Sequence, residues 1–550
     1  MGKESALHLF RRLEQLNSIG ASLSRERDID RLMENILEAA KTITHADGGT
    51  LYTVTDDGTA LAFEIVRNDS MGIRLGGTTG NAIAFADLPL RLPSGLPNDS
   101  LVAVHAAIHD RTVNITDAYT IQTFDFAGTR AFDQRTGYRS QSFLTVPMKN
   151  HEHELIGVLQ LINATDPITG ALTAFSPDDQ SLAESLASQA AIALTNRLLV
   201  AQLERLFESF INLINLAIDE KSPYTGGHCQ RVPKLIMLLA EAASATKTGP
   251  LAAFEMTDRD RYELKIAGLL HDCGKITTPV HVVDKATKLQ SIYDRIGLVD
   301  TRFEVLKRDA ELDALRKQLA LRPVVDAAAE SGVLAKMQQQ VQALHDDRAF
   351  LRLCNTGTES MRAEDQQRVR DLAARHTWRN ADGVLTEFLS AEEVENLTIR
   401  AGTLTQTERD VINHHIVATI KMLETLPWPR HLKNVPEYAG GHHERMDGKG
   451  YPRGLTRDQM SWQARMMGVA DIFEALTAAD RPYKTGMTLS QALGIMHKMT
   501  RNGHIDPDLF DVFLRKEVYL AYAHEFLDSS QIDAVDSVAS GWIGQTITPA

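Results

Sequence analysis

The chain has 550 residues, a formal net charge of −14 and 43% hydrophobic residues, a composition typical of a globular protein with two or more domains. The acidic balance disfavours a nonspecific nucleic-acid binder, because contacts to phosphates require a basic surface, although it leaves room for a local basic pocket. The three cysteines form no CxxC pair, and no run of residues approaches a membrane span. We therefore expect a cytoplasmic protein without a nucleic-acid or membrane partner.

The first part of the chain alternates between helical and strand patterns. Residues 5–45 are predicted to be helical, with one apolar stripe through Leu16 and Ile19 and a second through Ile29 and Ile36. Alternating segments then predict strands at 48–54, 60–66, 142–150 and 154–163. This pattern indicates an α+β domain with an antiparallel sheet over residues 1–178.

Residues 132–164, FDQRTGYRSQSFLTVPMKNHEHELIGVLQLINA, resemble the GAF sensory domains that flank phosphodiesterase domains. The continuation to Asp179 is similar to the signature of cyclic-nucleotide-binding GAF domains, with Ala164 and Gln180 where that signature has Lys and Glu. The resemblance implies that a cyclic nucleotide contacts Asn163, Phe175 and Asp179. The alternative is a GAF domain that dimerises or binds another molecule.

Residues 179–219 contain neither Pro nor Gly, and their apolar residues recur at helical spacing. These are Leu182, Leu186, Ala190, Ile192, Leu199, Leu203, Leu206 and Ile211. A helix of this length exceeds an ordinary connector, so we expect it to pair with its copy in a homodimer and to carry the sensor state onward. A helix buried within one chain is the alternative.

The remaining residues, 220–530, predict an all-helical domain, followed by a tail at 531–550. Residues 290–402 are rich in Ala, Gln, Arg, Asp and Leu and predict an insertion of solvated helices without a functional site. A lid or a dimer contact is the alternative.

Paired histidines begin the segment HHERMDGKGYP, which runs from His442 to Pro452. A buried pair of imidazoles needs partners for its ring nitrogens, and a metal ion satisfies that need. The adjacent Gly-rich turn indicates a site with an open edge.

Further metal-capable side chains lie on the apolar faces of predicted helices: His228, His271, Asp272, His415 and Asp471. His415 aligns with apolar neighbours, whereas His414 faces the surface. Any one of them alone is typical of a satisfied core residue. Together with His442 and His443, they match in number the ligands of two divalent ions, with Asp272 as the bridge. Mixed imidazole and carboxylate ligands suit iron, manganese or zinc, with nickel or magnesium as alternatives.

The segments YTGGHCQRV, HDCGK, HHERMDGKGYP, ADIFEALTAADRPYK and NGHIDP occur in the order of the HD-GYP family of cyclic di-GMP phosphodiesterases. The chain resembles this family from about residue 205 to 525, apart from the insertion. The resemblance implies an HD fold, a metal cluster of the iron or manganese type, and GGDEF-type protein partners. It also implies a site whose members fall into two groups. The metal ligands are His228, His271, Asp272, His415, His442, His443 and Asp471, and the substrate contacts are Lys275, Gly450, Tyr451, Pro452, Arg481 and Lys484.

The resemblance implies that Asp272 and Lys275 are catalytic in the hydrolysis of cyclic di-GMP to pGpG or GMP. A metal-activated hydroxide would attack phosphorus, with Lys275 near the scissile phosphate. Tyr224 occupies the position at which some members carry a glutamate for a third metal, so two metals are expected. Two alternatives stay open: a catalytically weak cyclic di-GMP receptor that signals through protein partners, and a hydrolase for another cyclic dinucleotide such as cyclic GMP-AMP.

Overall fold

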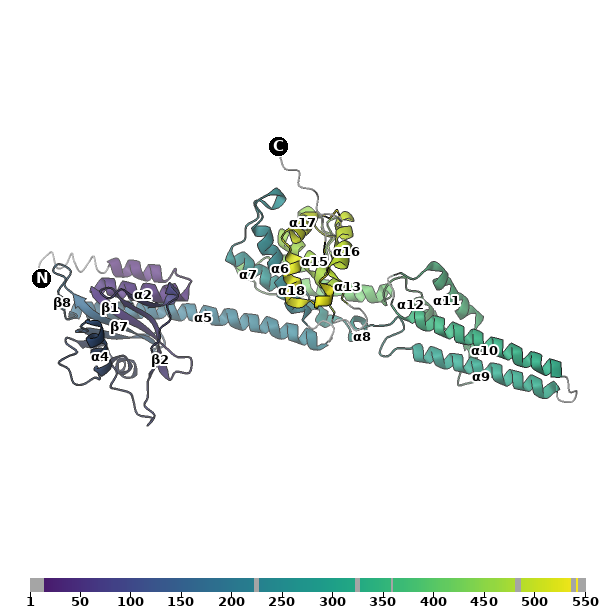
Figure 1. Ribbon diagram of the computed structural model, residues 1–550, viewed down its shortest axis with the longest axis horizontal. Helices are drawn as coiled ribbons and strands as arrows, with labels where there is room; N and C mark the ends of the chain where they lie inside the picture. Colours follow the sequence, from purple (N-terminus) through teal and green to yellow (C-terminus); the bar gives the residue numbers. More distant parts are fainter. Residues whose placement is uncertain are drawn as a thin grey trace. The chain divides into compact units, whose positions relative to one another are not determined.

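The computed structural model describes residues 14–221, 227–321, 327–357, 360–479, 486–535 and 541–542 (Figure 1). The chain divides into two compact units, residues 1–207 and 208–550. Tyr224, Arg481 and Lys484 lie outside the described residues, as does most of the predicted tail. Within the described ranges, no helix combines the length and the apolar character needed to cross a membrane.

The N-terminal unit is built on an antiparallel sheet in the order β3-β2-β1-β7-β6-β5. Its strands are β1 (Ala46–Val54), β2 (Ala60–Asn68), β3 (Ile73–Gly76), β4 (Leu88–Pro89), β5 (Val113–Ile115), β6 (Phe143–Lys149), β7 (Leu155–Thr165) and β8 (Leu172–Thr173). The four strands predicted from alternation are present as β1, β2, β6 and β7. The predicted α+β class with an antiparallel sheet is therefore confirmed.

Helices pack on both faces of this sheet, because successive side chains of each strand point to opposite faces. The helices are α2 (Ile29–Thr44), α3 (Val102–His109) and α4 (Ala127–Thr136), drawn with the sheet in Figure 1. Leu51 of β1 shares a buried cluster with Ile36 of α2. Its neighbour Tyr52 joins a separate cluster with Val104 of α3. Hydrophobic clusters therefore lie on both sides of the sheet, and a further cluster contains Val102 of α3 and Phe143 of β6.

Helix α5 (Pro177–Lys221) is 45 residues long, as the absence of Pro and Gly predicted. The exposure of its apolar residues changes along its length. Leu182 and Leu186 are buried in the core that contains Leu51. In contrast, Leu203 is 64% exposed and Leu206 is 53% exposed. The first turns of α5 thus stabilise the sheet, while later turns present apolar side chains to solvent.

The C-terminal unit is largely helical, which confirms the predicted class. Its helices outside the insertion are α6 (His228–Ser244), α7 (Asp258–Leu270), α8 (Val280–Val283), α13 (Gln406–Glu424), α14 (Val435–Gly440), α15 (Trp462–Thr477), α16 (Leu489–Arg501), α17 (Pro507–Arg515) and α18 (Val518–Phe526). Capping boxes at Thr257 and Thr405 start α7 and α13, because each threonine and the acid three residues later satisfy exposed backbone donors.

The predicted insertion forms a small structure of its own (Figure 1). It contains α9 (Ile296–Leu321), α10 (Ala327–Asn355), α11 (Ala363–Arg375), β9 (Thr377–Arg379), β10 (Leu385–Glu387) and α12 (Ala391–Leu397). These elements enclose a core around Phe303, Leu351 and Phe388, so the expectation of solvated helices was incomplete. The β9–β10 hairpin was not predicted, because each strand has only three residues.

Candidate metal centre

All seven predicted metal ligands of the C-terminal unit converge on one buried region. The ends and middles of five helices deliver them: His228 begins α6, His271 and Asp272 follow α7, His415 lies within α13, His442 and His443 follow α14, and Asp471 lies within α15. Five of the seven are buried, while His443 and Asp471 are partly exposed. The partial exposure places an open edge beside the cluster.

Asp272 lies between two groups of imidazoles. Its Oδ2 is 3.2 Å from Nε2 of His228 and 3.2 Å from Nε2 of His271. Its Oδ1 is 3.3 Å from Nε2 of His415 and 4.0 Å from Nε2 of His442. The two oxygens of one carboxylate therefore face two separate sets of nitrogen atoms.

The remaining two residues extend these groups. Oδ1 of Asp471 is 3.3 Å from Nε2 of His228, and Nε2 of His443 is 3.2 Å from Nε2 of His415. We name His228, His271 and Asp471 the first cluster and His415, His442 and His443 the second cluster. Each has the mixed imidazole and carboxylate chemistry that suits a divalent transition metal, with Asp272 shared between them.

Backbone and carboxylate acceptors orient four of the histidine rings. Nδ1 of His271 donates to Gly268 O at 2.8 Å, Nδ1 of His415 to Ile412 O at 2.5 Å, and Nδ1 of His442 to Ala439 O at 2.7 Å. Nδ1 of His228 faces Oε2 of Glu474 at 2.5 Å. Because a carbonyl oxygen can only accept, Nδ1 carries the proton in the first three rings, and the Nε2 lone pair points to the centre.

Two atoms at the centre have no hydrogen-bond partner among the described residues. They are Oδ1 of Asp272 and Nε2 of His442, and both are buried. Leaving a buried polar atom unpaired costs about 1–3 kcal/mol, and more when the group is charged. A cation between these two atoms would remove both costs, so the donor set fits a metal ion.

Electrostatics hold Asp272, His442 and His443 in the forms that bind metal. Burial raises the pKa of Asp272, but Lys275 and His271 outweigh it and the pKa lies well below the usual range. Burial lowers the pKa of His443 to about 4 and that of His442 well below the ordinary value. At neutral pH the carboxylate is ionised and both imidazoles are neutral, which are the ligating forms.

The close approach of two elements brings Asp272 to the second cluster. Gly274 follows Asp272 and packs against α13, where an added Cβ would lie 2.0 Å from His415 O and 2.5 Å from Thr419 N. The amide of Gly274 also donates to Thr419 Oγ1 at 2.9 Å. A side chain at this position would therefore separate Asp272 from His415.

Glu474 was missed by sequence reasoning. It is 1% exposed, and its other oxygen accepts from Nε of Arg231 at 2.8 Å. Glu474 lies three residues after Asp471 on α15, so the two acids share a helix face. That spacing is the signal that identifies it as a positioning residue for His228.

The turn after the paired histidines is tightly built. An added Cβ at Gly450 would lie 2.4 Å from Arg445 N. The carboxylate of Glu444 accepts from the amides of Arg453 and Leu455 at 2.8 Å each, so it stabilises the turn. The ring of Tyr451 stacks on His443 with centroids 4.9 Å apart, beside the second cluster.

Lys275 also reaches the centre. Its Nζ donates to Oδ2 of Asp272 at 2.5 Å. Exposed Pro452 follows Tyr451 at the rim of the turn after the paired histidines. Arg481 and Lys484 lie outside the described residues, and so does Tyr224.

The residues implied as GAF ligand contacts are engaged within the protein. Oδ1 of Asn163 accepts from the amides of Gln141 and Ser142, and its Nδ2 donates to Tyr138 and Arg139. Phe175 is 4% exposed in the core of the sheet. Asp179 accepts from Ser176 at the start of α5. The ligand role stays a prediction, and all three residues have structural roles here.

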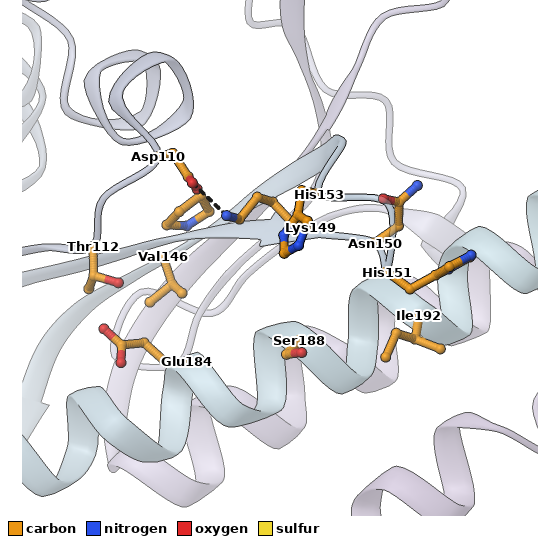
Figure 2. A pocket seen from close by; sticks show the side chains of 11 residues that line it. Asp110, Thr112, Val146, Lys149, Asn150, His151, His153, Glu184, Ser188 and Ile192 are labelled. Carbon is orange, nitrogen blue, oxygen red and sulfur yellow. Dashed lines mark hydrogen bonds and ion pairs between the residues drawn. The ribbon is translucent and has the colours of Figure 1, made fainter.

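A groove of about 420 Å³ lies elsewhere in this unit, between α5 and the β6–β7 turn. Figure 2 shows Glu184, Ser188 and Ile192 of α5 on one side and the ion pair between Lys149 and Asp110 on the other. None of the three implied ligand contacts lines this groove.

Comparison with protein families assigns both units. A GAF domain matches residues 28–194. One HD domain model matches residues 225–322, and a second matches residues 390–509. Together the two HD matches include all six residues of the two clusters and also Asp272, and they are interrupted between 322 and 390, inside the predicted insertion.

The chain matches less than half the length of each of three curated relatives. A 3'3'-cGAMP-specific phosphodiesterase of Vibrio cholerae is 37% identical over 133 residues, which cover 24% of this chain and 30% of the relative. A cyclic di-GMP phosphodiesterase of Pseudomonas aeruginosa is 36% identical over 25% of this chain and 32% of the relative. A probable cyclic di-GMP phosphodiesterase of Vibrio cholerae is 30% identical over 36% of this chain and 49% of the relative. The family matches show that the chain combines an N-terminal GAF domain with an HD domain in its C-terminal unit.

Proposed function

We propose that the protein is a metal-dependent phosphodiesterase that hydrolyses cyclic di-GMP to pGpG or GMP under control of its GAF domain. One observation carries the proposal: the two oxygens of Asp272 face two histidine clusters, and the buried atoms Oδ1 of Asp272 and Nε2 of His442 have no hydrogen-bond partner among the described residues. A receptor without turnover has no physical need for such a complete set of ligands.

The proposed metal ligands are His228, His271 and Asp471 for one ion and His415, His442 and His443 for the other, with Asp272 shared. Two bound divalent ions supply Lewis acidity, which lowers the pKa of water and withdraws charge from a phosphate. Glu474 and the backbone carbonyls of Gly268, Ile412 and Ala439 keep the imidazoles oriented.

Lys275 would stabilise negative charge on the scissile phosphate. Burial lowers its pKa, but Asp272 and Asp471 outweigh burial and raise it, so the ammonium is charged at neutral pH. In the proposed complex it exchanges its contact with Asp272 for a phosphate oxygen.

The GYP turn would receive the dinucleotide. Tyr451 lies beside His443 with its ring fixed by stacking, at the partly exposed edge of the second cluster. Gly450 keeps the turn compact and Pro452 borders it, while Arg481 and Lys484 would hold the second phosphate.

The relatives support two cyclic dinucleotides, since their names include both cyclic di-GMP and 3'3'-cGAMP. The second candidate function is therefore hydrolysis of 3'3'-cGAMP at the same site. A direct competition distinguishes them: the full chain is purified without oxygen, loaded with Mn²⁺ or Fe²⁺, and given both dinucleotides at equal concentration.

We expect linear pGpG or GMP to appear first and to be absent with Asp272→Ala. Exposed Asp258 provides the matched control, because Asp258→Asn removes a carboxylate remote from the clusters. Faster loss of 3'3'-cGAMP would favour the second function. Bound metal with no turnover of either dinucleotide would overturn both in favour of a receptor.

We also propose that α5 pairs with its copy in a homodimer. Exposed apolar residues follow the alternating three- and four-residue spacing of a coiled-coil seam. They are Leu199, Leu203, Leu206, Phe210 and Leu213, each at least 47% exposed. A monomer would leave this stripe in water along several turns.

Light scattering on the full chain tests the seam. Leu203→Glu combined with Leu206→Glu is expected to give a monomer, because charges replace the apolar contacts. Gln202→Glu adds a charge beside the seam and is expected to stay dimeric. A monomeric wild-type chain, or a dimer unaffected by the double substitution, would rule out this interface.

A further inference from the structure

A second histidine and carboxylate group lies in the GAF domain, on α3 and the turn before it. His105 and His109 are one helical turn apart, and Asp99 belongs to the preceding turn. Nε2 of His109 is 2.6 Å from Oδ1 of Asp99, and Nδ1 of His105 is 3.4 Å from the same oxygen. One ligand atom from each residue lies within 4.8 Å of the other two.

The backbone around Asp99 is fixed by its neighbours. Asn98 is 6% exposed, donates to Pro89 O at 2.9 Å and accepts from Ser100 Oγ at 3.1 Å. Ser100 O accepts in turn from Asp125 N at 2.8 Å. The carboxylate is therefore held against α3 by a turn that is anchored on both sides.

The two imidazole rings are also held in place. The ring of Phe124 meets His105 edge-on with centroids 5.1 Å apart, and the rings of His105 and His109 are 4.4 Å apart. Nδ1 of His105 is buried and has no hydrogen-bond partner within the described part of the chain. A nitrogen atom without a partner thus points to the carboxylate that already contacts His109.

We propose that Asp99, His105 and His109 bind one divalent transition metal ion of the zinc, cobalt and nickel class. Two histidines at positions i and i+4 present their nitrogens on one helix face, and a carboxylate completes three ligands. Magnesium and calcium are disfavoured, because they take oxygen ligands. The side chains are 29–49% exposed, so the ion has a path from solvent and keeps an open position.

Such an ion would join the turn before α3 to the helix itself, within the sensory domain. The site shares no residue with the HD centre. It therefore stands whether or not the chain hydrolyses a cyclic dinucleotide.

Cobalt provides the probe, because bound Co²⁺ is measured both by elemental analysis and by its visible absorption. The full chain is stripped with a chelator, saturated with Co²⁺ and desalted. We expect His109→Gln to hold one Co²⁺ fewer per chain than the wild type. Asp99→Asn preserves the shape of an exposed side chain. It is expected to raise the dissociation constant of that ion at least tenfold.

His151→Gln is the matched control, since His151 is an exposed histidine of the same domain. It should retain the full number of ions. Equal Co²⁺ content in His109→Gln and the wild type would overturn the proposal and leave a hydrogen bond between histidine and carboxylate. An equal loss in His151→Gln, or unchanged affinity in Asp99→Asn, would also overturn it.

Discussion

Asn163 in the GAF domain and Asp272 in the HD domain are both buried polar residues within recognisable signatures, yet the structure treats them differently. All polar atoms of the Asn163 amide are bonded to the protein. Oδ1 of Asp272 and Nε2 of the neighbouring His442 have no hydrogen-bond partner among the described residues. A residue of a family signature indicates a ligand most strongly where its polar atoms have no hydrogen-bond partner within the protein.

The largest effect is expected in the HD domain, for substitution of one of two adjacent histidines of α13. His415→Ala should lower turnover by about a hundredfold or more, because a proposed metal ligand is lost. Metal content and product formation measure the change. His414→Ala is the matched control, since His414 is exposed, and equal losses in both variants would contradict the assignment.

Asp506 is a buried carboxylate whose partners are protein groups. Nε of Arg457 donates to it at 2.8 Å and Nη1 of Arg465 at 2.5 Å. Asp506→Asn should cost about 3 kcal/mol of unfolding free energy at pH 7, because Arg465 loses its counterion and Arg457 keeps only Asp508. Denaturant titration measures the difference, with partly exposed Asp508→Asn as the smaller control.

The difference in unfolding free energy between the wild type and Asp506→Asn depends on pH with a definite sign. Burial raises the pKa of Asp506, but Arg457 and Arg465 outweigh it and the folded pKa is lowered. The stabilisation is therefore complete above the unfolded value of about 3.9 and is lost as pH falls through the folded pKa. A gap between wild type and Asp506→Asn that widens on acidification would contradict this linkage.

Glu474 tests whether orientation matters as much as ligation. Glu474→Gln should reduce metal affinity about 10–100-fold, because the charge that orients His228 is lost. Competition with a chelator measures the affinity, and Glu241→Gln serves as an exposed control. Lower turnover at saturating metal, with unchanged affinity, would instead point to a role in the reaction itself.

The smallest effect is expected on the GAF side. Asn163→Ala should lower the unfolding free energy of the GAF domain by about 2 kcal/mol, because buried backbone groups lose partners. Asn114→Ala removes an exposed amide from β5 and should change little. A stable Asn163→Ala domain with an altered response to cyclic nucleotides would restore the ligand role.

The sequence predicted much of the fold and the candidate ligand set. Alternation located β1, β2, β6 and β7, and apolar stripes singled out His415 rather than His414. These signals are local, because each depends on residues within one element. The core of the insertion around Phe303 and the link from Glu474 to His228 depend on contacts between distant segments, which periodicity does not encode.

Gly274 shows that a complete list of ligands does not guarantee a working centre. A single methyl group there would collide with the backbone of α13 at His415. A chain with alanine at this position would keep every proposed ligand residue, but Asp272 would be separated from His415. A screen of variants that checks only the ligand residues would count such a chain as intact. Glycine at position 274 should therefore be checked together with the ligands.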